Sequence, residues 1–343
     1  MADVVQGTQT INYGRVATLV TYQVMPDIAD NVFGTNRTLE LMESMARDYD
    51  WDGGQKLQIP LMLANPGKAT SFAGTEDVQS TPDKPWTAGF ASASSYGREV
   101  SVIQDDLDDV RGSSRGMKTL MTRLLMVAVK DIRDRMNKDL WRDGTTKSTD
   151  YPGFAAAIAS DPSGDTYLEV ASASNTTWQN VTVDNGNSSA DILLDLNNAK
   201  TNATFGSDKP TVLISGRTER DAFHGKLIAT LRADPIVIAR GGAGDPRIEE
   251  LEFGDARFLV DENRVAYGGG TNLTVAGLNM RHWYRSYKPT DFGSPVPGFA
   301  NLRMSEWSRV RGSAVFTTLL RWRGTFFTDA RRKHFVVFGL AAA

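Results

Sequence analysis

The sequence predicts an α+β fold, and two repeating patterns carry that prediction. Residues 115–141 place apolar side chains at steps of three and four, which is the repeat of one amphipathic helix of about 40 Å. Residues 55–63 and parts of 311–343 instead alternate apolar and polar side chains, which is the repeat of half-buried strands. With 343 residues, 41% of them hydrophobic and 23% charged, the chain is long enough to bury a sizeable core.

The N-terminal third is predicted to form an arm followed by a long β-ribbon. Residues 1–50 are interpreted as the arm, with a helix around Thr38–Arg47. In the strand at 55–63, Pro60 restricts the position to a sheet edge or a two-stranded ribbon, because proline cannot donate a ladder hydrogen bond. We predict that this strand pairs with a strand at Tyr96–Ile103. Residues 64–95 between them are far too many for an ordinary hairpin loop.

Four aspartates precede the long helix, and weaker patterns follow it. Asp105, Asp106, Asp108 and Asp109 are predicted to lie before the helix N-terminus, where the helix dipole favours negative charge. A calcium site is disfavoured because the twelve-residue loop spacing is missing. Further helices are expected near 192–199 and 218–231, and further strands at 211–215, 257–260 and 335–338.

Charge is distributed in alternating blocks along the chain. The net charge of −3 combines −9 over residues 1–110, +6 over 111–142, −8 over 143–280 and +8 over 281–343. Such blocks suit nucleic-acid binding by the basic parts. They also suit contacts between copies of one chain, because opposite potentials steer and register association. We favour self-association.

Composition excludes several classes of protein. The chain has no cysteine, which excludes disulfides, thiolate nucleophiles and cysteinyl metal sites. The longest unbroken apolar stretch, Leu124–Val129, is far shorter than the roughly 20 residues of a membrane span. We therefore expect no membrane partner and a location in the cytoplasm or in a particle assembled there.

Motifs for catalysis are weak. Gly112–Thr119 resembles a phosphate-binding loop and Phe258–Glu262 a magnesium-binding strand, but Met117 separates the second glycine from its lysine. His224, His282 and His334 have no second ligand at a metal-binding spacing, so packing roles are favoured. We predict no enzyme activity, no cofactor and no metal.

The order of these elements resembles the major capsid protein of tailed bacteriophages, the Hong Kong ninety-seven fold. Soft motifs support the resemblance: Ala73-Gly74-Thr75-Glu76 in the ribbon, Trp141-Arg142-Asp143-Gly144-Thr145 after the helix, and Pro152-Gly153-Phe154. The resemblance implies an N-terminal arm at 1–50, an extended ribbon (E-loop) at 51–103, a peripheral domain at 104–204 with the spine helix at 115–141, an axial domain at 205–300, and closing strands of the peripheral domain at 301–343.

The resemblance also implies a function and partners. It predicts a coat protein that self-assembles as hexamers and pentamers into an icosahedral head around double-stranded DNA, which it contacts without sequence specificity. A separate scaffolding protein, a portal and a decoration protein are the other expected partners, and the mature N-terminus is expected at or next to Met1. Candidate contacts between subunits are Lys56, Lys68, Phe72, Glu76, Asp77, Trp86, Arg98, Arg321 and Arg323.

Two alternatives remain at this point. An encapsulin-like nanocompartment shell shares the capsid fold but encloses packaged enzyme rather than nucleic acid. A P-loop-type ATPase, suggested by the near-match at Gly112–Thr119, would bind nucleotide as a monomer.

We predict that the shell is not covalently cross-linked. One branch of the family joins a ribbon lysine to an asparagine of a neighbouring subunit, with a glutamate in the closing strand as base. Here Gly312–Phe316 contains no asparagine, and Arg321-Trp322-Arg323 occupies the expected glutamate position. Arginine stays protonated and indole accepts no proton. Particles boiled in detergent should therefore run as one band near 37.5 kDa, whereas a ladder of multimers would contradict the prediction.

Overall fold

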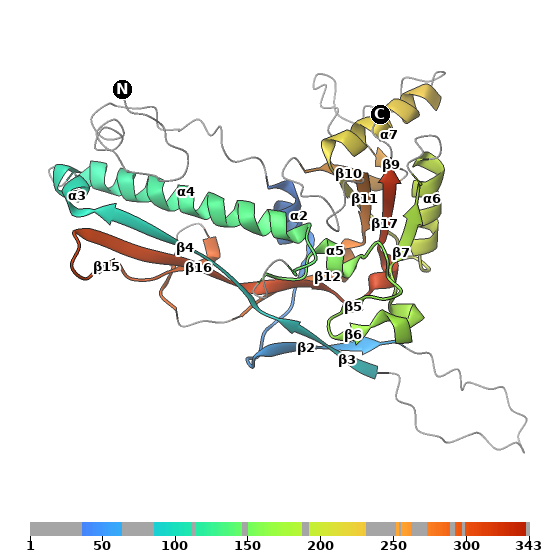
Figure 1. The fold of residues 1–343 in the computed structure, drawn as a ribbon, viewed down its shortest axis with the longest axis horizontal. Coiled ribbons are helices and arrows are strands. Elements are labelled where there is room, and N and C mark those ends of the chain that lie inside the picture. Colours follow the sequence, from blue (N-terminus) through green and yellow to red (C-terminus); the bar gives the residue numbers. More distant parts are fainter. Residues whose placement is uncertain are drawn as a thin grey trace, which may run out of the picture. The chain divides into compact units, whose positions relative to one another are not determined.

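A computed structural model gives the fold in Figure 1. It describes residues 36–63, 86–110, 114–145, 150–186, 192–230, 252–253, 255–261, 273–288, 292–296 and 299–340.

The chain divides into two compact units, each assembled from separate stretches of sequence. Unit 1 consists of residues 1–34, 96–134 and 290–322, and unit 2 consists of residues 35–95, 135–289 and 323–343. Helix α4 (Ser114–Leu140) and strand β16 (Val315–Thr328) run through both. The five-part division proposed from the sequence remains a prediction.

Unit 2 contains a six-stranded sheet in the order β7-β17-β11-β8-β10-β9. The strands are β7 (Val181–Asp184), β8 (Val212–Ser215), β9 (Glu252–Phe253), β10 (Ala256–Val260), β11 (Leu273–Leu278) and β17 (Phe335–Leu340). Helices α6 (Ile192–Ala203) and α7 (Arg217–Thr230) contact the sheet and each other, as Figure 1 shows. β8 is buried along its whole length because it is paired on both sides, by β11 and β10.

The core of this sheet combines aliphatic side chains with three buried phenylalanines, Phe223, Phe258 and Phe335. Phe223 of α7 stacks on Phe258 of β10 with ring centroids 5.4 Å apart, and Leu196 of α6 is fully buried beside them. Gly277 lies opposite Phe335, where a Cβ atom would come within 2.1 Å of the phenyl ring. Only glycine therefore fits at this position in β11.

The remainder of unit 2 consists of short elements around β12 (Trp283–Tyr287). This strand pairs with β1 (Arg47–Asp48) and with residues 324–328 of β16. The other elements are α2 (Arg37–Met45), the ribbon strands β2 (Lys56–Met62) and β3 (Trp86–Ser92), α5 (Phe154–Ala157), the hairpin β5 (Thr166–Tyr167) and β6 (Val170–Ala171), and the 3₁₀ turns η1 (Ser172–Ser174), η2 (Thr176–Trp178), η5 (Met280–His282) and η6 (Arg331–Lys333).

Unit 1 is built on the first half of β16. This half pairs with β4 (Ser94–Ile103), β14 (Phe299–Met304) and β15 (Ser308–Arg309), and β13 (Ser294–Val296) continues the sheet from β14. The short helix α3 (Gln104–Val110) follows β4 directly. Tyr96 of β4 packs on Trp322 of β16, with ring centroids 5.8 Å apart.

The long helix predicted from the repeat of apolar residues is confirmed. α4 spans Ser114–Leu140, against the predicted 115–141. Ala128, Ile132, Met136 and Leu140, which follow one another at steps of four, are all buried. Just beyond the helix, Gly153 approaches its last carbonyl oxygens so closely that a Cβ atom would lie 2.4 Å from that of Asp139. Among the described residues, no helix is long and apolar enough to cross a membrane.

One prediction about the N-terminal half is wrong. β2 pairs with β3 at Trp86–Ser92, not with the strand that includes Tyr96–Ile103, because that strand, β4, is used in the β16 sheet of unit 1. The second strand of the ribbon is therefore β3, which begins at Trp86. The aspartate cluster precedes the long helix, as predicted, and forms most of a separate short helix, α3.

Candidate functional site

The two-stranded ribbon β2–β3 is part of unit 2 and has one face that is largely buried. Leu57, Ile59 and Leu61 alternate along β2 and are all buried, as the alternation predicted. Ala91 of β3 lies opposite Leu57 on the same face. These four side chains are covered within the chain, since each is at most 6% exposed.

The outer face of the ribbon is apolar and exposed at one end. Met62 and Trp86 lie directly opposite each other in the antiparallel pair, and their side chains are 58% and 67% exposed. Pro60 and Ala88 form the next outward-facing pair. An exposed tryptophan beside an exposed methionine is unfavourable in water, so this end of the ribbon is a candidate contact surface.

A strained turn holds the base of the ribbon. Leu168 and Glu169, between β5 and β6, have φ angles of 53° and 63°, values that non-glycine residues rarely adopt. The backbone N–H of Phe90 in β3 donates to the carbonyl oxygen of Leu168 at 2.9 Å, and Glu169 forms an ion pair with Lys56 of β2. Both strained residues thus contact the ribbon, one on each strand.

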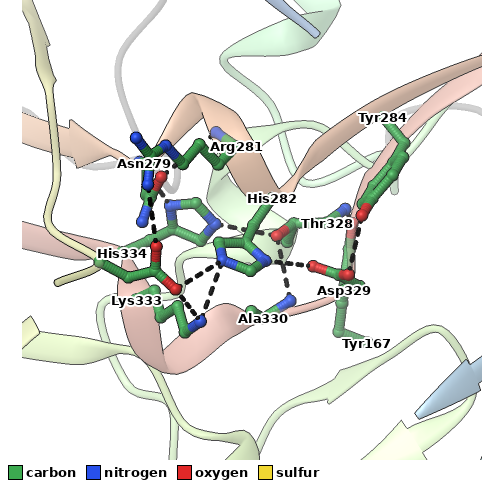
Figure 2. Close-up of polar contacts among 11 residues, drawn as sticks. Tyr167, Asn279, Arg281, His282, Tyr284, Thr328, Asp329, Ala330, Lys333 and His334 are labelled. Carbon is green, nitrogen blue, oxygen red and sulfur yellow. Dashed lines mark hydrogen bonds and ion pairs between the residues drawn. The ribbon is translucent and has the colours of Figure 1, made fainter. Parts of the chain in front are cut away.

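A polar network lies beside η5 and η6 in the same unit (Figure 2). His282 Nδ1 is 2.8 Å from Asp329 Oδ1, and His282 Nε2 is 3.0 Å from Lys333 Nζ. Because the carboxylate only accepts and the ammonium only donates, the neutral ring carries its proton on Nδ1. Lys333 also donates to Asp208 at 2.6 Å, and this hydrogen bond is the largest of the contributions from Lys333 and His282 that lower the pKa of Asp208 to about 2.

His334 is enclosed next to this network. Its Nδ1 accepts from the backbone N–H of Asn279 at 3.0 Å, so its proton is on Nε2, which donates to Thr328 Oγ1 at 2.8 Å. Burial, with the nearby charges of His282, Arg331 and Lys333, lowers the pKa of His334 to about 3. A threonine beside a histidine has the geometry of a nucleophile and its base, but this imidazole is too weakly basic and too enclosed for that role.

The stability of the fold should depend on pH through His334. Between about pH 6.5 and pH 3 the unfolded chain binds a proton at this imidazole and the folded chain does not. The free energy of unfolding should therefore fall with acidification by about 1.4 kcal/mol per pH unit below pH 6 from this group. In urea titrations at pH 7 and pH 5, His334→Gln should lose less stability between the two pH values than the wild type. Equal losses would contradict the assignment.

Comparisons with known proteins show which solved structures share this fold. No family model and no curated protein matches the chain. Solved structures match over almost its whole length. The cyanophage A-1(L) capsid asymmetric unit gives a TM-score of 0.63 at 11% identity, covering 93% of this chain and 96% of that one. The Mycobacterium phage Bobi structure gives 0.57 at 15% identity, covering 95% and 98%.

The chain has the Hong Kong ninety-seven capsid fold. The predicted fold class is thereby confirmed, with the long helix and the ribbon as its two extended elements. The holo-SrpI encapsulin complex from Synechococcus elongatus PCC 7942 also matches, with a TM-score of 0.60 at 10% identity and coverage of 95% of both chains.

The predicted contact residues on the ribbon of this capsid fold are only partly described. Lys56 lies on β2 in its ion pair with Glu169, and Trp86 begins β3 with its ring exposed. Lys68, Phe72, Glu76 and Asp77 lie outside the described residues.

The three predicted arginines are all in sheets of the capsid fold. Arg98 of β4 forms an ion pair of 2.7 Å with Asp131 of α4. Arg321 lies over the ring of Phe292 at 5.7 Å. Arg321 and Arg323 lie on the face of β16 opposite the buried Leu320 and Trp322. Their roles between subunits stay predictions.

The magnesium-binding strand suggested for an ATPase has a packing role. Asp261, at the end of β10, is 1% exposed. Its Oδ2 accepts from Asn137 Nδ2 at 2.9 Å and from Trp141 Nε1 at 3.3 Å, both at the end of α4, and from the hydroxyl of Thr38. The carboxylate therefore joins three elements of unit 2.

Sequence reasoning missed two groups of residues that position these elements. The network of His282 with Asp208 and Asp329 joins residues 47 to 74 positions apart, so no spacing signals it. The Leu168–Glu169 turn carries no glycine or asparagine, which are the usual signals of a positive φ.

Proposed function

We propose that the chain is a major capsid protein, a coat protein that self-assembles into an icosahedral phage head enclosing double-stranded DNA. The fold likeness to named capsids over more than nine-tenths of the chain supports this proposal. A shell protein needs self-complementary surfaces rather than a reaction centre. The described side chains around His282 and His334 hydrogen-bond to one another and to the backbone, which agrees with a role that is not enzymatic.

The observation that carries the proposal is the outer face of the ribbon. Trp86 and Met62 project from a ribbon whose other face is already covered by its own chain. A second copy of the chain would bury them, as assembly into hexamers and pentamers requires. Burial of these two side chains on every subunit would contribute to each contact around the shell.

Other partners follow from the same proposal. A separate scaffolding protein, a portal and a decoration protein would act during assembly in the host cytoplasm, and the finished protein would reside in the virion. DNA would be contacted through its phosphates without sequence reading.

Electron microscopy of the purified full chain tests the proposal. We expect closed shells of regular diameter, and we expect shells recovered from infected or co-expressing cells to contain nuclease-protected double-stranded DNA. A monomer that stays monomeric at all protein and salt concentrations, with or without scaffold, would refute it.

The encapsulin match favours one second candidate, a protein nanocompartment. Its shells would protect a specific packaged protein instead of DNA. Analysis of the contents of purified shells for nucleic acid and for protein distinguishes the two functions.

A further inference from the structure

A tight turn after α6 in unit 2 carries an exposed aromatic side chain. The backbone N–H of Phe205 donates to the carbonyl oxygen of Asp208 at 2.9 Å, and that of Asp208 donates back to Phe205 at 3.1 Å. Between them Gly206 has a φ angle of 64°, which glycine adopts without strain. Phe205 is 61% exposed, although a phenyl side chain is stabilised by burial. The turn therefore holds in water a side chain that is suited to a contact.

The polar network beside η5 and η6 fixes this turn in place. Asp208 accepts from Lys333 Nζ at 2.6 Å, and the same ammonium lies 3.0 Å from His282 Nε2. Figure 2 shows that His282 is held on its other side by Asp329. These contacts attach the turn to two further elements, so Phe205 is presented in one shape before any partner binds. Such preorganisation lowers the entropy cost of forming a contact.

Positive charge flanks the exposed ring. The guanidinium of Arg332 lies over the ring of Phe205 at 5.4 Å. Arg332 is exposed and forms no ion pair with a carboxylate in the described part of the chain. The side chain of Arg281 is 67% exposed and approaches Asp208 only to 3.5 Å, where Lys333 already pairs with that carboxylate. Together Phe205, Arg281 and Arg332 form an apolar and cationic surface, the Phe205 surface.

A stretch between α2 and β2 of the same unit has the complementary character. Residues 45–52, the acidic segment, hold three aspartates and one arginine. Asp50 and Asp52 are exposed, and neither forms a hydrogen bond or ion pair within the described residues. Asp48, by contrast, is already in an ion pair. Met45, at the end of α2, is 48% exposed. The segment thus offers two carboxylates and an apolar side chain that its own chain leaves uncovered.

We propose that the Phe205 surface of one copy binds the acidic segment of a neighbouring copy. Phe205 packs on Met45 in this contact, and Arg281 and Arg332 face Asp50 and Asp52. Phenylalanine, methionine and arginine are residue types that are enriched in protein interfaces. Because the two surfaces are different, each copy binds one neighbour through each of them, and the contact repeats from copy to copy. The inference rests on the proposed shell function and assigns one of its contacts.

The acidic segment suits the Phe205 surface better than two other occupants do. Two Phe205 surfaces placed face to face would bring four guanidinium groups together, and like charges repel. Duplex DNA would neutralise the arginines but would set its charged phosphates against the phenyl ring. A protein surface that carries both carboxylates and an apolar side chain is complementary to the ring and to the arginines at once.

Charge reversal in the full chain tests the contact. The basic-side variant, Arg281→Glu with Arg332→Glu, and the acidic-side variant, Asp50→Arg with Asp52→Arg, should each raise the protein concentration needed for shell assembly by about tenfold or more, because each places like charges against each other. The chain that combines all four substitutions restores opposite charges and should assemble within about threefold of the wild type. Arg217→Glu, at the exposed start of α7, is the control for an arginine reversal outside the contact and should assemble normally.

Removal of the ring tests the apolar part without changing any charge. Phe205→Ser should also raise the concentration needed for assembly by about tenfold or more, because the ring no longer packs on Met45. Leu194→Ser removes an exposed apolar side chain elsewhere in unit 2 and should assemble normally. Circular dichroism verifies that each variant is folded.

Each outcome decides the proposal. Weaker assembly of both charge variants and of Phe205→Ser, with recovery in the combined chain, supports it. Normal assembly of any one of these three variants overturns it while leaving the shell function intact, as does loss without recovery. Normal shells of the basic-side variant that contain less DNA would assign the arginines to DNA and overturn the contact between copies. A wild-type chain that never assembles refutes the proposed function itself.

Discussion

Replacing Arg331 with methionine should lower the free energy of unfolding by about 3–5 kcal/mol, because it leaves a buried set of acceptors without their donor. The Arg331 side chain is fully buried. Its Nη2 donates to Asp165 Oδ2 at 2.7 Å, its Nη1 donates to Ser172 Oγ at 2.7 Å, and its Nε donates to the carbonyl oxygen of Ala157 at 2.6 Å. The guanidinium also lies over the ring of Tyr167 at 5.3 Å.

This arginine joins η6 to α5, to the β5–β6 hairpin and to η1, and that hairpin holds the ribbon. Chemical denaturation of the unassembled chain measures the effect. The neighbouring Arg332 is the matched control, since it is exposed and contacts the ring of Phe205 instead. Arg332→Met should change stability by less than about 1 kcal/mol. Similar losses of stability in the two variants would contradict the role of Arg331 in joining these elements.

Replacing both Trp86 and Met62 with serine should abolish shell formation without unfolding the subunit. Burying each side chain against a neighbour is worth about 1.5–3 kcal/mol, so the pair contributes more than about a hundredfold to each contact. The side chains are exposed in the single chain, which is why its stability should barely change. Sedimentation at a concentration where the wild type is fully assembled measures the loss.

A matched control comes from α6. Leu194 is 56% exposed, on the surface of the other part of unit 2, and Leu194→Ser removes a similar apolar group away from the ribbon. It should assemble as the wild type does. If the ribbon variant still forms complete shells, the outer face of β2–β3 is not a contact surface.

The sequence by itself determined the elements whose signal is local. The helix at Ser114–Leu140, the alternating strand β2 and the buried side of α6 each repeat a pattern within a few turns or residues. The structure has the first two within one residue of the predicted limits, and α6 begins at the predicted residue but continues four residues further, to Ala203. The layout of arm, ribbon and long helix was also enough to suggest the capsid fold, because extended elements of this length are rare in compact domains.

Only the tertiary structure decided which strands pair and which groups the buried polar side chains contact. β3 and β4 are separated by only one residue. β2 pairs with β3 because β4 is already paired with β16, and no local sequence pattern predicts that pairing. The partners of Arg331, Asp261 and His282 lie from 47 to 223 positions away along the chain. Buried polar groups must find donors or acceptors in the folded chain, and which ones they find depends on the packing of whole elements rather than on residue type or spacing.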